Sequence, residues 1–161
     1  MFFSLLFRSP GLLIAWIVAV LIAITVHEFS HALMAKMRGD RTAEREGRLS
    51  LNPLDHVDPI GFLMLLLLGF GWAKPVPYNP YNLRDPKWDS VAVGLAGPTS
   101  NLLMAIVASF GLKGLLVIGF DPFNLASVFL FLCVYINLLL LFFNAIPIHP
   151  LDGAKLVLAV F

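Results

Sequence analysis

Two histidines and a glutamate near the start of the chain have the spacing of a metal site. His27, Glu28 and His31 form the pattern His-Glu-x-x-His. Residues four apart lie on one face of a helix, so both imidazoles can reach the same Zn²⁺. Glu28 lies beside them, where its carboxylate could take a proton from a water molecule at the metal. The pattern therefore predicts two zinc ligands and a general base.

The position of this pattern argues against the simplest alternative. In a soluble helix, His-Glu-x-x-His can arise by chance on a solvated face. Here it follows the apolar run from Leu12 to Val26, which is typical of a membrane helix. A charged side chain at membrane depth costs about 3 kcal/mol on insertion scales, so such residues are rare without partners. A functional role is therefore favoured over a structural one.

The composition predicts a membrane protein with several spans. Of 161 residues, 59% are hydrophobic and 13% are charged, and the mean hydropathy is +0.87. Soluble domains carry about 25% charged residues. The formal net charge is only +1, without a basic run of the kind that binds nucleic acid, so nucleic acid is not an expected partner. Cys133 is the single cysteine, which excludes a disulfide within the sequence.

Three of four apolar stretches are long enough to cross a bilayer, which takes about 20 helical residues. The second stretch would rise only about 20 Å as a helix, and Pro59 before it and Pro75 after it oppose its extension. We therefore predict an all-α polytopic membrane protein with three long transmembrane helices and a short re-entrant segment, with room for small β-hairpin elements in the loops. The four stretches are Gly11 to Met37, Ile60 to Trp72, Val91 to Leu112 and Leu125 to Ile146.

The placement of basic residues predicts how the helices are oriented. Lysines and arginines flank the short second stretch, whereas the loop from Lys113 to Asn124 has a single basic residue. Basic loops stay on the cytoplasmic side, so the first helix runs inward and ends near His31. We expect a multi-pass protein of the cell membrane with its site toward the cytoplasm. The flanking basic residues are Lys36, Arg38, Arg41, Arg45, Arg48, Lys74, Arg84 and Lys87.

The same topology limits where a third metal ligand can lie. A catalytic zinc normally has three protein ligands and keeps a fourth position for water. The chain after Ile146 returns to the side of His31, and it contains two candidates, His149 and Asp152. Two prolines interrupt this segment, and such broken backbone at membrane depth needs protein or a polar cavity beside it. If Ile60 to Trp72 were a full crossing, both candidates would lie on the opposite side.

A polar cluster in the third apolar stretch allows two interpretations. Gly97, Pro98 and Ser100 are small or kinking residues, which are explained by close helix packing. Asn101 could form a hydrogen bond near the metal site or only between helices, and the sequence does not decide between them. His56 lies in a turn-like stretch, where a surface or packing role is expected.

Together these segments resemble the site-2 proteases, which are zinc metalloproteases that cleave within the membrane. The resemblance rests on His27–His31, on Gly97–Asn101, and on Asn144–Gly153 with its Pro-Leu-Asp-Gly core. The stretches Gly47–Pro53 and Gly71–Pro77 are similar to the compact prokaryotic branch without appended domains. The resemblance covers nearly the whole chain.

The resemblance implies a ligand set and a function. His27, His31 and Asp152 would bind one Zn²⁺ per chain, Glu28 would be the general base, and Asn144 matches a position that hydrogen-bonds the substrate carbonyl or its oxyanion. The chain would cleave transmembrane or membrane-proximal segments of membrane proteins in the lipid bilayer. A metal-binding membrane protein without proteolysis, such as a transporter or scaffold, is the alternative.

The resemblance also implies how the chain is organised. Residues 1–161 would form a single intramembrane metalloprotease domain. Only Gly153 to Phe161 follow the third ligand, so we expect this domain to be truncated at its C-terminus. The natural substrate and the oligomeric state remain open.

Overall fold

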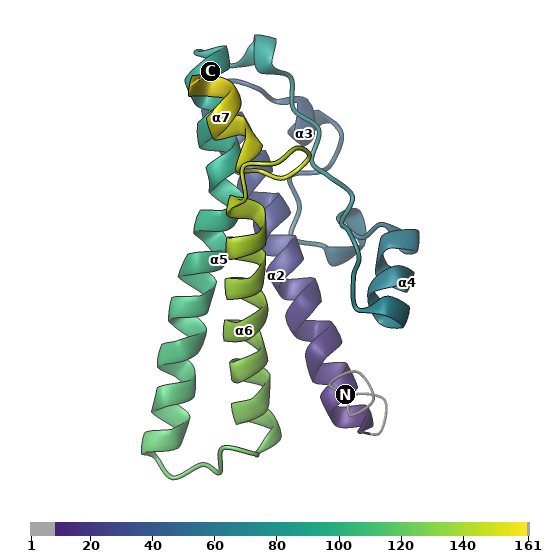
Figure 1. Ribbon diagram of the computed structural model, residues 1–161, viewed down its shortest axis with the longest axis vertical. Helices are drawn as coiled ribbons and strands as arrows, with labels where there is room; N and C mark the ends of the chain where they lie inside the picture. The colour runs from purple at the N-terminus through teal and green to yellow at the C-terminus, as the bar shows by residue number, and fades with distance from the viewer. Residues whose placement is uncertain (1–8, 161) are drawn as a thin grey trace.

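Three long helices pack side by side in the computed structural model, which describes residues 9–160 (Figure 1). They are α2 (Pro10–Met37), α5 (Pro86–Val117) and α6 (Leu125–Ala145). All three are long and apolar enough to cross a membrane, which confirms the predicted fold class and indicates a multi-pass membrane protein. The shorter helices are α3 (Thr42–Arg45), α4 (Pro59–Leu68) and α7 (Ala154–Val160), with 3₁₀ turns at Pro53–Asp55 and Pro80–Asn82.

The helices begin where the local sequence predicts. Proline occupies the first helical position of α2, α4 and α5, where its missing N–H would have no helical partner in any case. Asp58 and Asp85 cap α4 and α5 by accepting hydrogen bonds from backbone N–H groups one turn inside each helix. Gly69 ends α4 in the left-handed region, with φ 74°.

Small residues allow α2 and α6 to pack closely in the half of the bundle that contains the start of α2. Ala19 and Ala23 of α2 are 1% and 0% exposed, and they belong to one apolar cluster with Leu132 and Ile136 of α6. Alanine places little volume between two helices, so their backbones can approach. This packing fixes the relative position of the two helices that lead to the site.

The re-entrant segment is a hairpin that consists of the short helix α4 and a stretch of chain that leads back to the start of that helix. The ten residues of α4 rise about 15 Å, roughly half the thickness of a bilayer core. Val57 before the helix pairs with Ala73 after it in an isolated antiparallel bridge, and the Lys74 N–H donates to the His56 carbonyl at 2.9 Å. Within residues 9–160 this bridge stands in place of the small β-hairpin elements that the sequence allowed.

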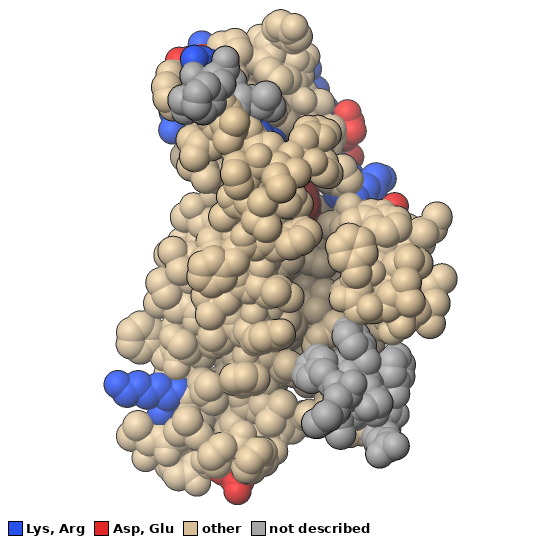
Figure 2. Space-filling view, viewed as in Figure 1, with Lys and Arg blue, Asp and Glu red and all other residues tan. Residues whose placement is uncertain are grey.

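Charged side chains gather at one end of the molecule. In the view of Figure 2, lysines, arginines and carboxylates cluster at the upper end and along the upper right edge, above a wide band with little charge. This end holds the last turn of α2, α3, the start of α5, and α7 (Figure 1). Most of the bundle is therefore suited to contact with lipid tails.

Candidate metal centre

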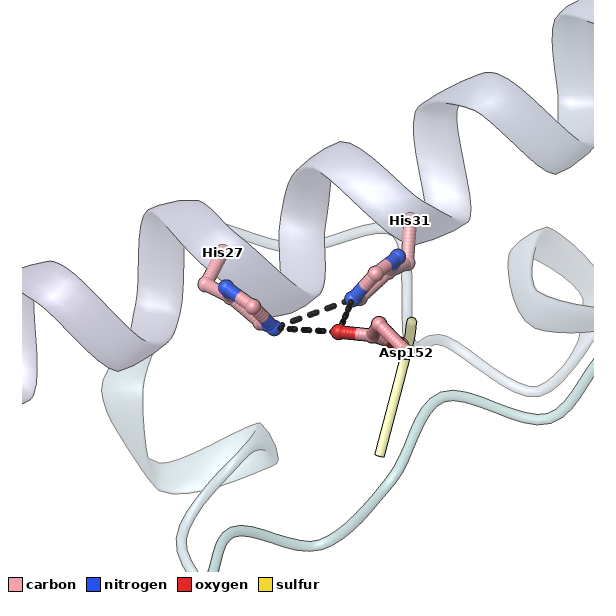
Figure 3. Close-up of side chains that lie close together, drawn as sticks. All are labelled: His27, His31 and Asp152. Carbon is pink, nitrogen blue, oxygen red and sulfur yellow. Dashed lines mark hydrogen bonds and ion pairs between the residues drawn. The ribbon is translucent and has the colours of Figure 1, made fainter. Parts of the chain in front are cut away.

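The side chains of His27, His31 and Asp152 converge at one point (Figure 3). His27 Nε2 and His31 Nε2 are 3.0 Å apart, and each lies 3.1 Å from Asp152 Oδ2. The two histidines come from consecutive turns of α2, and the aspartate comes from the segment between α6 and α7. The structure thus brings Asp152 to the histidines and leaves the other candidate, His149, exposed and outside this group.

In each imidazole, the nitrogen that faces away from Asp152, Nδ1, forms a hydrogen bond with α5. His31 Nδ1 lies 2.6 Å from the backbone carbonyl of Val93 in α5, and His27 Nδ1 lies 2.5 Å from Asn101 Oδ1. A carbonyl oxygen can only accept a hydrogen bond, so His31 carries its proton on Nδ1. In the neutral imidazole its Nε2 is then a lone pair that faces Asp152.

A buried chain of amides fixes the same tautomer for His27. The carbonyl of Cys133 accepts a hydrogen bond from Asn137 Nδ2, and Asn137 Oδ1 accepts from Asn101 Nδ2, both at 2.8 Å. Because the chain starts at an acceptor, each amide is oriented, and Asn101 Oδ1 must accept from His27 Nδ1. Asn101 and Asn137 are 0% and 1% exposed. His27 therefore also presents an Nε2 lone pair.

With both imidazoles neutral, three electron-pair donors face one another, which is an arrangement that a cation stabilises. In tetrahedral zinc sites with metal–nitrogen distances of about 2.05 Å, ligand atoms lie about 3.3 Å apart, close to the separations of 3.0 and 3.1 Å found here. Two imidazoles and one carboxylate are a known catalytic zinc set. The donor set fits zinc, the cofactor that the sequence predicts.

Gly97 gives the two imidazoles their space. A Cβ atom at this position would overlap His31 Nε2 and lie 2.6 Å from His27 Nε2. The sequence suggested only a packing role for this glycine. Its helix, α5, approaches the two candidate metal ligands so closely that even alanine does not fit.

Glu28 lies beside the ligands and is held by the backbone of another segment. Its Oε2 accepts a hydrogen bond from the Val76 N–H at 3.1 Å. Glu28 and Asn144 line the same small cavity as the three ligand residues, with a volume of about 160 Å³. The amide of Asn144 donates to the Leu140 carbonyl at 3.0 Å. The carboxylate is thus positioned next to the metal ligands without belonging to them.

Residues 73–79, which we call the strap, carry Val76 across the site. Near one end the Lys74 carbonyl accepts from Arg48 Nη2 at 2.6 Å. At the other end the Asn79 N–H donates to Asp40 Oδ2 at 2.7 Å. Pro75 and Pro77 lack an N–H group, so Val76 supplies the only backbone donor of that tripeptide, and this donor is used by Glu28.

Some of the residues that surround the site were not identified from the sequence. His56 is fully buried, and its Nε2 lies 2.7 Å from the Ser50 carbonyl, which agrees with a packing role and not with a surface one. Asn137 was not singled out, although an amide within an apolar stretch is the kind of polar residue that marks a buried site. Lys155, whose Nζ donates to Asp152 Oδ1 at 3.1 Å, was also missed.

Curated relatives share most of this chain. A protein of Bacillus subtilis named "Putative zinc metalloprotease YwhC" is 37% identical over 145 residues, which cover 88% of this chain and 66% of that protein. Rip2 of Mycolicibacterium smegmatis, with the same description, is 33% identical over 89% of this chain and 56% of its own length. The chain belongs to the site-2 protease family of zinc metalloproteases.

An archaeal relative extends this site-2 protease group. MJ0611 of Methanocaldococcus jannaschii, also named as a zinc metalloprotease, is 27% identical over 96% of this chain and 76% of its own length. The chain thus spans 66% and 56% of the two bacterial relatives. No family model and no solved structure matches the chain.

Proposed function

We propose that this chain is a zinc-dependent endopeptidase that cleaves transmembrane or membrane-proximal segments of other membrane proteins. The convergence of His27, His31 and Asp152 beside Glu28 carries the proposal. The site lies within the bundle of three apolar helices, so a segment already in the bilayer is the substrate that reaches it most directly. The names of the relatives support metalloprotease chemistry.

The chain's own residues supply the proton transfer and the orientation. Bound zinc would contribute Lewis-acid polarisation of a peptide carbonyl and lower the pKa of a water molecule to about 7. Glu28 would take a proton from the attacking water and return it to the nitrogen of the leaving amine as the C–N bond breaks. Asn144, in the same cavity, would donate a hydrogen bond to the developing oxyanion.

We further propose that the site faces the cytoplasm of the cell. It lies in the second half of α2, because His27 comes 17 residues after Pro10 and Met37 comes only six residues after His31. The loops next to that end carry most of the basic residues, and basic loops stay on the cytoplasmic side. The packing of α2, α5 and α6 against one another supports a single domain.

Comparing the parent chain with Glu28→Gln in liposomes tests the proposal. The substrate is a single-pass protein whose apolar segment contains a helix-breaking residue, and zinc content is measured on both proteins. We expect the parent to cleave and Glu28→Gln to retain zinc while losing at least about 100-fold in rate, because general base catalysis contributes about 10² to 10⁴.

Two outcomes would contradict the proposal. Cleavage that is unchanged in Glu28→Gln would remove the base assignment. If both proteins bind zinc and neither cleaves any membrane segment, the chain is a metal-binding membrane protein without proteolysis. His31→Ala is the control for zinc content, because it removes one ligand and leaves Glu28 in place.

A further inference from the structure

A second cavity lies deeper in the molecule, between α2, α6 and the re-entrant hairpin that contains α4. Its volume is about 210 Å³. Figure 1 shows α4 beside α2, on the side away from α5. Trp16, Val20 and Ile24 of α2 form one wall, and Leu139 and Leu140 of α6 form another. We call this space the deep cavity.

Each of the three segments that line the deep cavity, namely α2, α6 and the hairpin, continues to the site. Ile24 is one helical turn before Glu28 on α2, and Leu140 is one turn before Asn144 on α6. On the hairpin, Ala73 lies three residues before Val76, whose N–H group reaches Glu28. Both helices therefore lead from this cavity to the site, and the cavity lies farther from the charged end of the bundle.

The size of the deep cavity limits what it can hold. An apolar cavity of about 150 Å³ binds benzene. The space of about 210 Å³ therefore suits one large apolar side chain or two small ones.

The lining of the deep cavity selects an apolar occupant. Aromatic rings from Trp16, Phe62, Trp72 and Tyr135 contribute to its surface. Among the described residues that line it, none carries a carboxylate, an ammonium or a guanidinium group. The lining also includes His56, whose Nε2 donates to the Ser50 carbonyl and whose Nδ1 is a lone pair in the neutral imidazole. A carboxylate would therefore lose its hydration there without gaining a hydrogen-bond donor from His56.

We propose that the deep cavity is a specificity pocket that binds a large apolar side chain of the membrane segment being cleaved. This inference rests on the proposed function. Trp16, Val20 and Ile24 lie about 18, 12 and 6 Å from Glu28 along the axis of α2. An extended chain advances about 3.3 Å per residue. The selected side chain is therefore two to five residues from the scissile bond, on the side deeper in the membrane.

A matched set of substrates and enzyme variants tests the pocket. Single-pass substrates in liposomes differ only at these positions, where they carry Ala, Phe, Trp or Asp. We expect the parent to cleave the Phe substrate about 10-fold faster than the Ala substrate, as is typical for filling an apolar pocket, and the Asp substrate more slowly than both. Leu139→Trp should remove the preference for Phe, because Leu139 lines the cavity and the larger ring would fill it. The fold should accept this change, because Leu139 is 55% exposed.

The control makes the same change away from the pocket. Leu103 is 58% exposed on α5 and does not line the deep cavity, so Leu103→Trp should keep the preference for Phe. Phe62→Ala should move the preference toward a Trp substrate, because it enlarges the pocket. Equal rates for the Ala and Phe substrates in the parent, or an unchanged preference in Leu139→Trp, would overturn the proposal.

A binding measurement separates this inference from the proposed function. A photo-crosslinking phenylalanine analogue replaces Phe62 in the Glu28→Gln variant, and captured molecules are identified by mass. We expect capture of the Phe substrate and not of the Asp substrate, and this result would support the pocket even if no substrate were cleaved. Capture of lipid acyl chains alone would show that the cavity is a lipid site.

Discussion

The metal centre is bounded on one side by α5 and α6 and on the other by the strap, and the two sides are held by different interactions. On the helix side, Asn101, Asn137 and the Val93 carbonyl form buried hydrogen bonds that end on the imidazoles. On the strap side, one backbone N–H, that of Val76, reaches Glu28. We therefore expect α5 and α6 to determine the affinity of the site for a metal ion, and the strap to determine the position of the Glu28 carboxylate.

Adding a single methyl group at Gly97 tests how closely α5 approaches the two imidazoles. Gly97→Ala places a Cβ 2.6 Å from His27 Nε2, and the rigid helix backbone cannot move aside, so we expect loss of zinc and of all cleavage. The measurement is zinc content after purification. Gly111→Ala in the same helix is the control, because its Cβ would lie 3.4 Å from Leu130 Cδ1. Full zinc content in Gly97→Ala would disprove this account of the helix side.

The amide chain is expected to have the next largest effect. Asn101→Leu removes the acceptor of His27 Nδ1 and leaves that N–H group buried without a partner. Loss of such a partner typically costs 10- to 100-fold in metal affinity, which competition with a chelator would measure. Thr99→Val, an exposed position on the same helix, should leave the affinity unchanged. Equal affinities for Asn101→Leu and the parent would show that Asn101 serves packing alone.

On the strap side, a glycine-to-alanine change should leave the zinc content unchanged. Gly61 and Gly71 pack backbone against backbone at the base of the hairpin, and a Cβ on Gly71 would overlap the Gly61 carbonyl and lie 2.7 Å from Leu65 Cβ. We expect Gly71→Ala to shift the strap and lower kcat/KM by about 10-fold, since small misplacements of catalytic groups are costly. Zinc content should stay at the parent level. Loss of zinc in this variant would remove the distinction between the two sides.

The smallest effect is expected where the strap is tied to the end of α2. Burial raises the pKa of Asp40, but hydrogen bonds from Thr42, Asn82 and Asn79 outweigh burial and hold that pKa below its usual range. A lowered pKa means that the carboxylate stabilises the fold above about pH 4, and that this contribution is lost as the pH falls toward the folded-state pKa.

Asp40→Asn should therefore lower the free energy of unfolding by about 1 to 2 kcal/mol at pH 7. The difference from the parent should shrink as the pH falls below about 4, which thermal unfolding in detergent at several pH values would show. Glu46→Gln changes an exposed carboxylate of the same loop and is the control. A difference that grows as the pH falls would have the wrong sign.

Local sequence was sufficient to predict the helices. The three long apolar stretches became α2, α5 and α6, with boundaries close to those expected except for α5, which begins at Pro86 and ends at Val117. The start of α5 is polar, and Asp85 caps it, so hydropathy alone placed the boundary too late. The re-entrant segment was also predicted, because its length and its flanking prolines are properties of a short stretch of chain.

The sequence by itself determined which residues of one helix can bind the same metal ion, because His27 and His31 are four residues apart. The predicted topology left Asp152 and His149 both open, the family resemblance pointed to Asp152, and neither gave a partner for Asn101. Those answers depend on contacts across 125 and 74 residues of chain, which only the packing of α5, α6 and the segment after α6 creates. The tertiary structure also decided that Gly97 must lack a side chain and that Val76 holds Glu28, because both follow from how closely separate segments approach.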